Sequence, residues 1–455
     1  MRQHMRWAVT LGALSSALIL GSIATAQPIA QSIRPEIRPV NDTVSRANPG
    51  SVLTFEPVQV TRPQTRPATV AEPAPPAVPK TAEDAGFQRW ITGFRGRAIV
   101  QGISGSTYDR AFEGVRYDPD VIKRDRNQSE FTKTIWEYLD SAASDSRIKN
   151  GKAALRQHRR KLEAIEKRYG VEKEVVVAVW GLESAYGSYR GKNDVVQSLA
   201  TLAYDGRRGK FFEGQLIAAL KILQSGDTRP RSMTGSWAGA MGHTQFMPTS
   251  YLDHAVDFTG DGKRDIWSDD PTDALASTAA YLAGFGWVTG QPWGVEVKLP
   301  RGFDYASANR KVKRSPAQWA NLGVVGMDGR AVPNYGAGSI LLPAGGQGAA
   351  FMVFKNFSVI ERYNAADAYV IGVGHLSDRI KGGPAIQADW PRGDRALTFA
   401  ERKEMQRRLT GAGFSTQGVD GKIGPKTIEA VRSFQRSKGL DQDGYASLSL
   451  LERLR

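Results

Sequence analysis

VVVAVWGLESAYG, residues 175 to 187, is the stretch around which the chain is organised. It is strongly apolar and carries a single carboxylate, Glu183. In a helix, Glu183 would share a face with Val176, Val179 and Trp180, because residues three, four and seven apart lie on one side. A carboxylate on an apolar face loses hydration, which raises its pKa and keeps it protonated near neutral pH. Such a group can protonate a leaving oxygen.

Gly187 ends this stretch and predicts where the helix stops, since glycine is the preferred residue just beyond a helix C-terminus. Glu183 is therefore expected in the last helical turn, where a helix can open onto a cleft. The alternative is structural, a buried glutamate that forms an ion pair with an arginine. The stretch by itself favours neither interpretation.

The composition of the whole chain is that of an ordinary soluble globular protein. Its 455 residues are enough for two or three domains, and 41% of them are hydrophobic and 24% charged. A net charge of +15 favours an anionic partner, which could be nucleic acid, a membrane surface or a cell-wall polymer. The chain has no cysteine, so it forms no disulfides and carries no cysteine-linked lipid.

The N-terminus predicts export. Arg2 and Arg6 precede an apolar stretch over residues 7–23, and Ala24-Thr25-Ala26 forms an A-x-A cleavage site, so we expect a signal peptide over residues 1–26. An uncleaved anchor is the alternative. Export to the periplasm makes nucleic acid an unlikely partner, and cleavage would leave no stable membrane anchor. Residues 27–82 are rich in proline, threonine and alanine and predict a disordered linker.

Helical periodicity recurs over most of the remaining chain. Helices are expected in residues 86–103, 129–139, 151–169 (one long basic helix), 202–223 (two helices) and 273–287. Between residues 295 and 348 the pattern fades while glycine and proline become frequent, which predicts an irregular insertion with short strands. The fold class is therefore mainly α (α+β), with one irregular insertion and a small C-terminal domain.

Two segments after Glu183 carry polar groups in unusual surroundings. SWAGAMGHTQFMPTSY, residues 236–251, places Ser236 and Gln245 among glycines, which let a backbone approach a ligand closely. FKNFSVIERYNAADAYVIGVGHL, residues 354–376, contains Tyr363, Asn364 and Tyr369, which suit stacking on sugars and binding of N-acetyl groups. A tight glycine-rich connection and a helix core are the structural alternatives.

DFTGDGKRDIW, residues 257–267, matches the first half of an EF-hand loop, with oxygen ligands at alternate positions and glycine at the sixth. The twelfth position is Ser268, where that loop needs a bidentate glutamate, but a longer loop could close on Asp273. Hard oxygen ligands in a flexible loop favour Ca²⁺ over Mg²⁺.

The five histidines lack metal-ligand spacing, and no serine-hydrolase or P-loop motif occurs, so the chemistry is expected to rest on carboxylates.

Taken together, these segments resemble the lytic murein transglycosylase B family, which cleaves peptidoglycan glycan strands. The resemblance runs from about Gly86 to Arg379, through SEFTKTIWEYLDSAASDSRI, GLESAYG, AYDGRRGKFF, the 236–251 segment and DFTGDGKRDIW. It implies a lysozyme-like helical catalytic domain, which we place at residues 83–390. Residues 396–455 resemble a three-helix peptidoglycan-binding module, and their two Asp-Gly turns, at 420–421 and 443–444, indicate a weak internal repeat.

The resemblance implies that Glu183 is the sole catalytic acid and base. It would protonate the oxygen of the β-1,4 bond between N-acetylmuramic acid and N-acetylglucosamine, and then accept the proton of the muramyl C6 hydroxyl as that oxygen attacks C1. The product is a 1,6-anhydromuramyl end, and no cofactor is needed. An ordinary glycosidase would instead need a second carboxylate, for which Asp205 and Glu213 are candidates.

Carried over by motif position, the residues expected to bind substrate are Ser236, Gln245, Tyr363, Asn364, Tyr369, Arg207 and Arg208, the two arginines facing the acidic peptide stems. The ligands implied for a structural Ca²⁺ are Asp257, Thr259, Asp261, the Lys263 carbonyl and Asp273. Peptidoglycan is the expected partner, with cell-wall synthases as further partners. The alternatives are a hydrolytic muramidase and a non-catalytic wall-binding scaffold.

Overall fold

The computed structural model describes residues 82–126 and 133–455 of the chain. The predicted signal peptide and almost all of the predicted linker lie outside these residues. In the described ranges, no helix is sufficiently long and apolar to cross a membrane. The described residues form three separate hydrophobic cores, which belong to a large helical body, to the insertion and to the C-terminal module.

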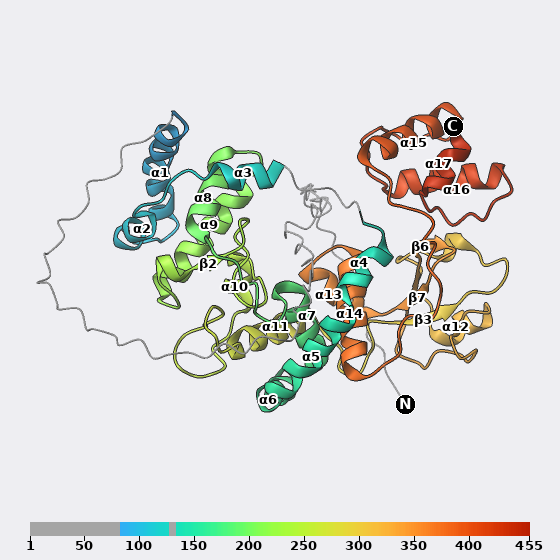
Figure 1. Ribbon diagram of the computed structural model, residues 1–455, viewed down its shortest axis with the longest axis horizontal. Helices are drawn as coiled ribbons and strands as arrows, with labels where there is room; N and C mark the ends of the chain where they lie inside the picture. Colours follow the sequence, from blue (N-terminus) through green and yellow to red (C-terminus); the bar gives the residue numbers. More distant parts are fainter. Residues whose placement is uncertain (1–81, 127–132) are drawn as a thin grey trace, which may run out of the picture.

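Helices build the large body, and Figure 1 shows α1 and α2 beside α8 and α9 at one end of it. Its first elements are α1 (Ala82–Val100), α2 (Gly105–Phe112), α3 (Pro119–Arg126), α4 (Ile135–Ala142), α5 (Asp145–Gln157), α6 (Arg159–Tyr169) and α7 (Lys173–Ser184). The next are α8 (Val195–Asp205), α9 (Gly209–Ser225), a 3₁₀ turn η1 (Pro230–Ser232), α10 (Pro248–His254) and α11 (Thr272–Gly284). The body closes with α13 (Lys355–Tyr363) and α14 (Asp367–Lys381). The short strands β1 (Asn193–Asp194) and β2 (Thr234–Gly235) pair antiparallel.

Helix α7 lies at the centre of this body. All ten residues from Val175 to Ser184 are buried, and α14, α5, α6 and α11 pack around the helix. A helix that is apolar on every side is stable only when it is surrounded in this way. The apolar stretch at residues 175–187 therefore supplies most of the central helix on which the other helices pack.

One predicted helix is wrong in its extent. Residues 151–169 were expected to form one long helix, but α5 ends at Gln157 and α6 begins at Arg159. His158 is the last cap of α5 and the first cap of α6, and its ring packs edge-on against Trp180 of α7 at 5.5 Å. The break lets both helices follow the surface of α7, which hydrophobic periodicity along one segment could not reveal.

The insertion is a small sheet with its own core. Its elements are β3 (Gly294–Lys298), a 3₁₀ turn η2 (Tyr305–Ser307), α12 (Pro316–Asn321), β4 (Val325–Gly326), β5 (Ser339–Leu341), β6 (Pro343–Gly346) and β7 (Ala350–Val353). The sheet order is β4-β3-β7-β5, and every neighbouring pair is antiparallel. Trp319 is fully buried beneath it. The expectation of an irregular region with short strands is confirmed.

The C-terminal module has three helices, α15 (Phe399–Gly411), α16 (Pro425–Ser437) and α17 (Leu448–Leu454), as predicted. Its core contains Met405, Leu409, Val431, Phe434 and Leu451. In Figure 1 the module lies next to β6 of the insertion. The mainly α fold expected from the sequence is confirmed.

Candidate active site

Glu183 lies in the last turn of α7, and its side chain is almost fully buried, with 8% of the residue exposed. Val176, Val179 and Trp180, predicted to share its helical face, are buried as well. The helix ends at Ser184, three residues before Gly187, so the predicted stop is displaced. The last-turn position expected for Glu183 is the one observed.

The chain leaves α7 through three consecutive residues with positive φ, at 48° for Ala185, 59° for Tyr186 and 86° for Gly187. Residues other than glycine rarely adopt this left-handed backbone conformation, so tertiary contacts must stabilise it. The Tyr186 hydroxyl donates to the Arg147 carbonyl at 2.7 Å. Glycine is required at 187, since a Cβ there would lie 2.6 Å from Nδ1 of His243. The reversal directs the chain away from the end of α7 and leaves Glu183 at its edge.

The Tyr369 hydroxyl donates a hydrogen bond of 2.7 Å to Oε1 of Glu183. Tyr369 belongs to the first turn of α14 and is itself buried. A phenol in this position stabilises a carboxylate as it becomes ionised and fixes its orientation. The predicted catalytic residue and one predicted binding residue are therefore in direct contact.

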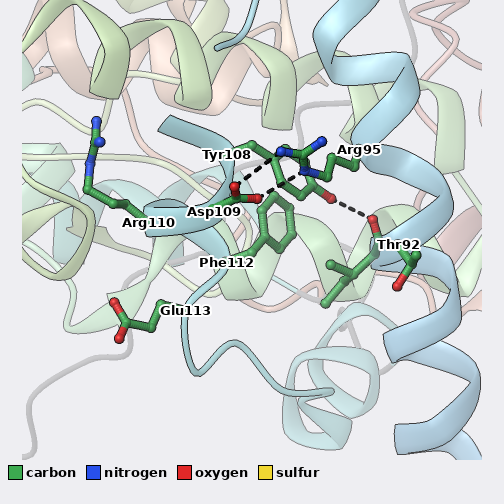
Figure 2. Close-up of a pocket in the computed structure, with 8 residues that line it drawn as sticks. Thr92, Arg95, Tyr108, Asp109, Arg110, Phe112 and Glu113 are labelled. Carbon is green, nitrogen blue, oxygen red and sulfur yellow. Dashed lines mark hydrogen bonds and ion pairs between the residues drawn. The ribbon is translucent and has the colours of Figure 1, made fainter. Parts of the chain in front are cut away.

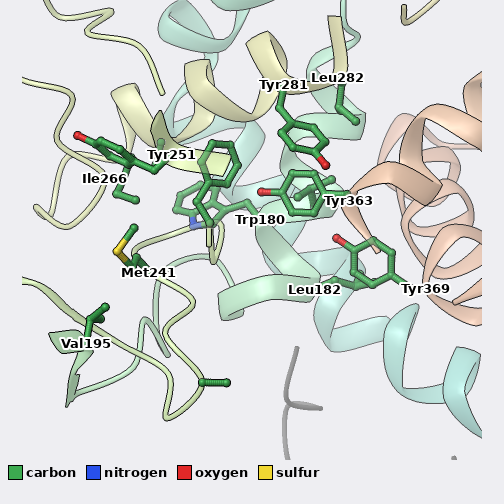
Figure 3. Close-up of a cluster of buried hydrophobic side chains, with 14 of the residues drawn as sticks. Trp180, Leu182, Val195, Met241, Tyr251, Ile266, Tyr281, Leu282, Tyr363 and Tyr369 are labelled. Carbon is green, nitrogen blue, oxygen red and sulfur yellow. The ribbon is translucent and has the colours of Figure 1, made fainter. Parts of the chain in front are cut away.

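Tyr363 and Asn364 lie where α13 ends, one short corner before Tyr369. The rings of Tyr363 and Tyr369 are parallel, with centroids 6.5 Å apart, and Figure 3 shows both beside Leu182 and Trp180 of α7. The Tyr363 hydroxyl donates to the Thr244 carbonyl at 2.7 Å, and Oδ1 of Asn364 accepts from the Ala366 amide at 3.0 Å. This corner therefore ties α14 to the glycine-rich 236–251 segment.

The 236–251 segment is a tight loop held by its own polar side chains. Oγ of Ser236 accepts from the Ala240 amide at 3.0 Å. Gln245 has a φ of 55°, and its Nε2 donates to the carbonyls of Arg190 at 3.0 Å and Gly242 at 2.8 Å. Gly242 admits no side chain, since a Cβ would collide with the Ile266 carbonyl. Both predicted polar residues shape the loop that faces the end of α7.

Ser184 and His243 join this loop to α7, and neither was predicted as a site residue from the sequence. The Ser184 hydroxyl donates to the His243 carbonyl at 2.5 Å and accepts from the Gly187 amide at 2.9 Å. Nδ1 of His243 accepts from Trp180 Nε1 at 3.2 Å, which assigns the ring proton to Nε2, 2.7 Å from the Ser268 carbonyl. Burial lowers the pKa of His243, so the ring is neutral and acts as a fixed spacer.

Arg207 and Arg208, expected to meet peptide stems, both pair with one buried carboxylate. Nε of Arg207 lies 2.8 Å from Oδ2 of Asp125, and a terminal nitrogen of Arg208 lies 2.6 Å from Oδ1. Asp125 is 3% exposed, so this double pair fastens α3 to the turn that precedes α9. The role of the arginines toward substrate stays a prediction.

Asp205 and Glu213, the candidates for a second catalytic carboxylate, are each held in an ion pair with another helix. Asp205 accepts from Arg126 of α3 at 2.6 Å. Glu213 accepts from Arg97 of α1 through both oxygens, at 3.0 and 3.2 Å. These pairs belong to the packing of α1 and α3 on α8 and α9. Neither pair includes Glu183 or the residues of the 236–251 segment.

The loop from Asp257 to Asp273 brings three carboxylates together. Ligand oxygens of Asp257, Asp261 and Asp273 lie within 4.8 Å of one another. Burial raises the pKa of Asp273, and the nearby charge of Asp257 adds to the effect. The Thr259 hydroxyl points to Oδ1 of Asp257 at 3.3 Å, and the Lys263 amide donates to Asp261 at 2.9 Å. A set of hard oxygens at this spacing fits a calcium ion.

A separate hollow of about 550 Å³ opens between α1 and α2, and Figure 2 shows its lining. Arg95 and Asp109 form a bidentate ion pair on its wall, at 3.0 and 3.1 Å, and Tyr108 donates to the Ile91 carbonyl at 2.6 Å. Arg95, Asp109 and Tyr108 are thus already engaged within the wall of the hollow. None of the predicted site residues lines it.

Comparison with known proteins connects this geometry to a family. Residues 86–378 match the model of the transglycosylase SLT domain, and residues 400–454 match that of a putative peptidoglycan binding domain. Membrane-bound lytic murein transglycosylase B of Escherichia coli K12 is 33% identical over 250 residues, which are 53% of this chain and 66% of that relative, just under two thirds of its length.

Solved structures give the same result. SltB3 from Pseudomonas aeruginosa, in complex with NAG-anhNAM-pentapeptide, is 49% identical and covers 81% of this chain and 99% of its own, with a TM-score of 0.79. Slt35 from Escherichia coli, in complex with calcium, is 29% identical over 66% of this chain and 94% of its own, with a TM-score of 0.56. The chain therefore belongs to the SLT-domain transglycosylases and is a lytic murein transglycosylase with a C-terminal peptidoglycan-binding domain.

Proposed function

We propose that Glu183 cleaves the β-1,4 bond between N-acetylmuramic acid and N-acetylglucosamine, acting first as an acid and then as a base. The observation that carries the proposal is the buried carboxyl at the end of α7, in contact with the Tyr369 hydroxyl at 2.7 Å. Burial disfavours the ionised form before reaction, while the phenol donor stabilises the charge that appears once the proton has left. One carboxyl can therefore serve both half-reactions.

In the first step the proton of Glu183 moves to the glycosidic oxygen, and the bond from that oxygen to muramyl C1 breaks. In the second step the C6 hydroxyl oxygen bonds to C1 and its proton returns to Glu183. Atoms balance without water, and the muramyl residue leaves as a 1,6-anhydro sugar. The bound NAG-anhNAM-pentapeptide of the SltB3 structure is a product of this kind, which supports the assignment.

The surrounding polar residues would position the strand. Nε2 of Gln245 is engaged by two carbonyls, and no hydrogen bond from the described part of the chain reaches its Oε1, which can accept from a sugar hydroxyl or acetamido N–H. Tyr363 and Tyr369 offer a pair of parallel rings, and Asn364 and Ser236 lie on the adjoining segments. Binding of these groups to the saccharide would keep the C6 hydroxyl close to C1.

A structural calcium ion is proposed at Asp257, Asp261 and Asp273, with Thr259 and the Lys263 carbonyl completing the set. The convergence of three carboxylates supports it, and Slt35 was solved with calcium. The ion would neutralise like charges and hold the loop that leads into α11. It takes no part in the reaction.

The setting of the reaction is proposed to be the periplasm, after export by the signal peptide at residues 1–26 and cleavage after Ala26. The basic n-region, the apolar core and the A-x-A site support this proposal. The linker over residues 27–82 would let the enzyme reach the wall, and cell-wall synthases are proposed as partners that supply new strands.

The test compares Glu183→Gln with Glu213→Gln on purified sacculi, with products identified by mass spectrometry. We expect E183Q to release no anhydromuropeptides, because an amide can neither give nor accept the required proton. E213Q should keep its activity, because a surface ion pair contributes at most about 1 kcal/mol to stability. Activity that survives E183Q, or products heavier by one water, would refute the assignment.

A further inference from the structure

The C-terminal module contains two copies of one local arrangement, in which a helix glutamine holds an Asp-Gly turn. In the first copy, Nε2 of Gln406 donates to Oδ1 of Asp420 at 2.9 Å, and its Oε1 accepts from the Gly421 amide at 2.8 Å. The Lys422 amide also donates to Oδ1 of Asp420, at 2.9 Å. One oxygen of the aspartate is thereby used to fix the turn.

The second copy repeats each of these bonds. Nε2 of Gln435 donates to Oδ1 of Asp443 at 2.7 Å, its Oε1 accepts from the Gly444 amide at 2.9 Å, and the Tyr445 amide donates to Asp443 at 2.9 Å. The internal repeat expected from the two Asp-Gly turns is therefore a structural one.

The surface beside each turn is also repeated. Phe399 lies seven residues before Gln406, and Ile428 lies seven before Gln435. A Cβ on Gly421 would collide with the Phe399 ring, and one on Gly444 would lie 2.7 Å from Cγ2 of Ile428. A cation follows at the same spacing in each helix, Lys403 in the first copy and Arg432 in the second.

The second copy is occupied by the insertion. The Gly346 amide of β6 donates to the free oxygen of Asp443, Oδ2, at 2.9 Å. Arg432 donates to the Tyr305 carbonyl at 3.1 Å, and a Cβ on Gly345 would lie 2.6 Å from Cβ of Tyr445. This surface of the module thus binds a peptide backbone. The aspartate accepts a hydrogen bond from a backbone amide, and the cation donates one to a backbone carbonyl.

The first copy presents the same groups to solvent. Phe399 is 42% exposed, and Asp420 and Lys422 are exposed. Oδ2 of Asp420 accepts no hydrogen bond from residues 82–126 or 133–455, and Nζ of Lys403 lies 4.5 Å from the centre of the Phe399 ring. The amide of Gln406 holds the pKa of Asp420 below its usual range, so the carboxylate is ionised.

We propose that this first turn, formed by Phe399, Lys403, Asp420 and Lys422, binds the peptide stem of peptidoglycan. Asp420 would accept a stem amide N–H and Lys403 a stem carbonyl, as the second copy does with the insertion. Stem peptides also carry free carboxylates, which complement the two lysines, and the Phe399 ring can cover an alanine methyl group. The proposal rests on the proposed function, in which peptidoglycan is the substrate. It assigns the second turn to docking on the insertion and the first turn to binding of substrate.

The experiment measures binding of the full chain to purified sacculi, with Glu183→Gln as the parent so that the wall is not digested. Asp420→Asn keeps the acceptor for Gln406 but removes the charge and one acceptor oxygen. We expect D420N to weaken binding about tenfold, since hydrogen bonds to charged groups are among the stronger ones. Phe399→Ala, at an exposed ring, should weaken binding in the same direction.

Asp443→Asn is the matched control, because it makes the same change in the docked turn. D443N should leave sacculus binding within about twofold, since a single surface contact outside the binding turn is lost. Sacculi stripped of their stems by an amidase should bind the parent weakly, and D420N should then add no further loss.

Wild-type binding by D420N and F399A would overturn the proposal. A protein loop would then be the better candidate for the ligand of the first turn. Equal loss on intact and stripped sacculi would also overturn it, because the glycan would be the ligand. A parent that fails to bind sacculi, or a wild-type enzyme that makes no anhydro product, would refute the proposed function instead. The two failures are therefore distinguishable.

Discussion

Replacing Tyr369 with phenylalanine tests how the fold activates Glu183. The change removes one oxygen from a buried side chain and keeps the ring that lies parallel to Tyr363. The lost interaction is the 2.7 Å hydrogen bond to Oε1 of Glu183. Because the substitution keeps the ring and its packing against Tyr363, we expect the variant to fold and to bind strands normally.

The magnitude follows from the charge on Glu183 during the reaction. A hydrogen bond to a charged group contributes about 1.5–3 kcal/mol, and about 1.4 kcal/mol corresponds to a factor of ten in rate. Tyr369→Phe should therefore lower kcat about 10- to 150-fold while KM changes little, because the bond strengthens as the proton leaves Glu183. Release of anhydromuropeptides from sacculi, followed over time, provides both constants.

Tyr108→Phe is the matched control. It removes a buried phenol of the same kind, which donates from α2 to the Ile91 carbonyl of α1 at 2.6 Å. Its effect on kcat should stay below about threefold, as an uncharged hydrogen bond contributes about 1 kcal/mol, mainly to stability. A Y369F enzyme with the kcat of the wild type, or equal losses in both variants, would refute the role of Tyr369.

Three further outcomes are expected. Burial raises the pKa of Asp378 to about 6, so the folded state holds this proton more tightly than the unfolded chain, and stability falls as pH rises through that range. Asp378→Asn should thus gain about 2.4 kcal/mol in unfolding free energy relative to wild type between pH 4 and pH 8, measured in urea. Ser184→Ala, which frees the His243 carbonyl, should cost about 1–3 kcal/mol of stability. Chelating calcium should lower Tm, and the unfolding free energy should fall by about 2.7 kcal/mol if the ion had been at 100 times its Kd. Asp273→Asn should make the stability independent of calcium.

The double use of one turn type gives the C-terminal module a defined position. Asp443 and Arg432 bind the backbone of the insertion, so the module is docked rather than merely tethered. A docked module holds its free turn at a fixed distance from Glu183. Strands bound through their stems would then be presented to the active site at a limited set of positions, and binding energy would contribute to orientation.

The sequence by itself determined the mainly helical fold, the central helix and the carboxylate that we propose to be catalytic. These depend on local pattern, since an apolar run of this length and composition favours a helix in the centre of a helical domain, where all ten residues from Val175 to Ser184 are buried. The short strands of the insertion and the three helices of the module follow from local composition in the same way. The Asp-Gly repeat was visible because each Asp-Gly pair begins five residues before a helix, α16 in the first copy and α17 in the second.

Only the tertiary structure decided which groups meet. Tyr369 is 186 residues from Glu183, and the contact exists because α14 packs along α7. The hydrogen bond from Ser184 to His243 and the ion pair of Arg207 with Asp125 arise in the same way, each between a helix and a loop distant in sequence. Hydrophobic periodicity states that a face is buried but not against what, because apolar contacts are non-directional. The partners of a buried polar group are therefore fixed only when the helices have packed.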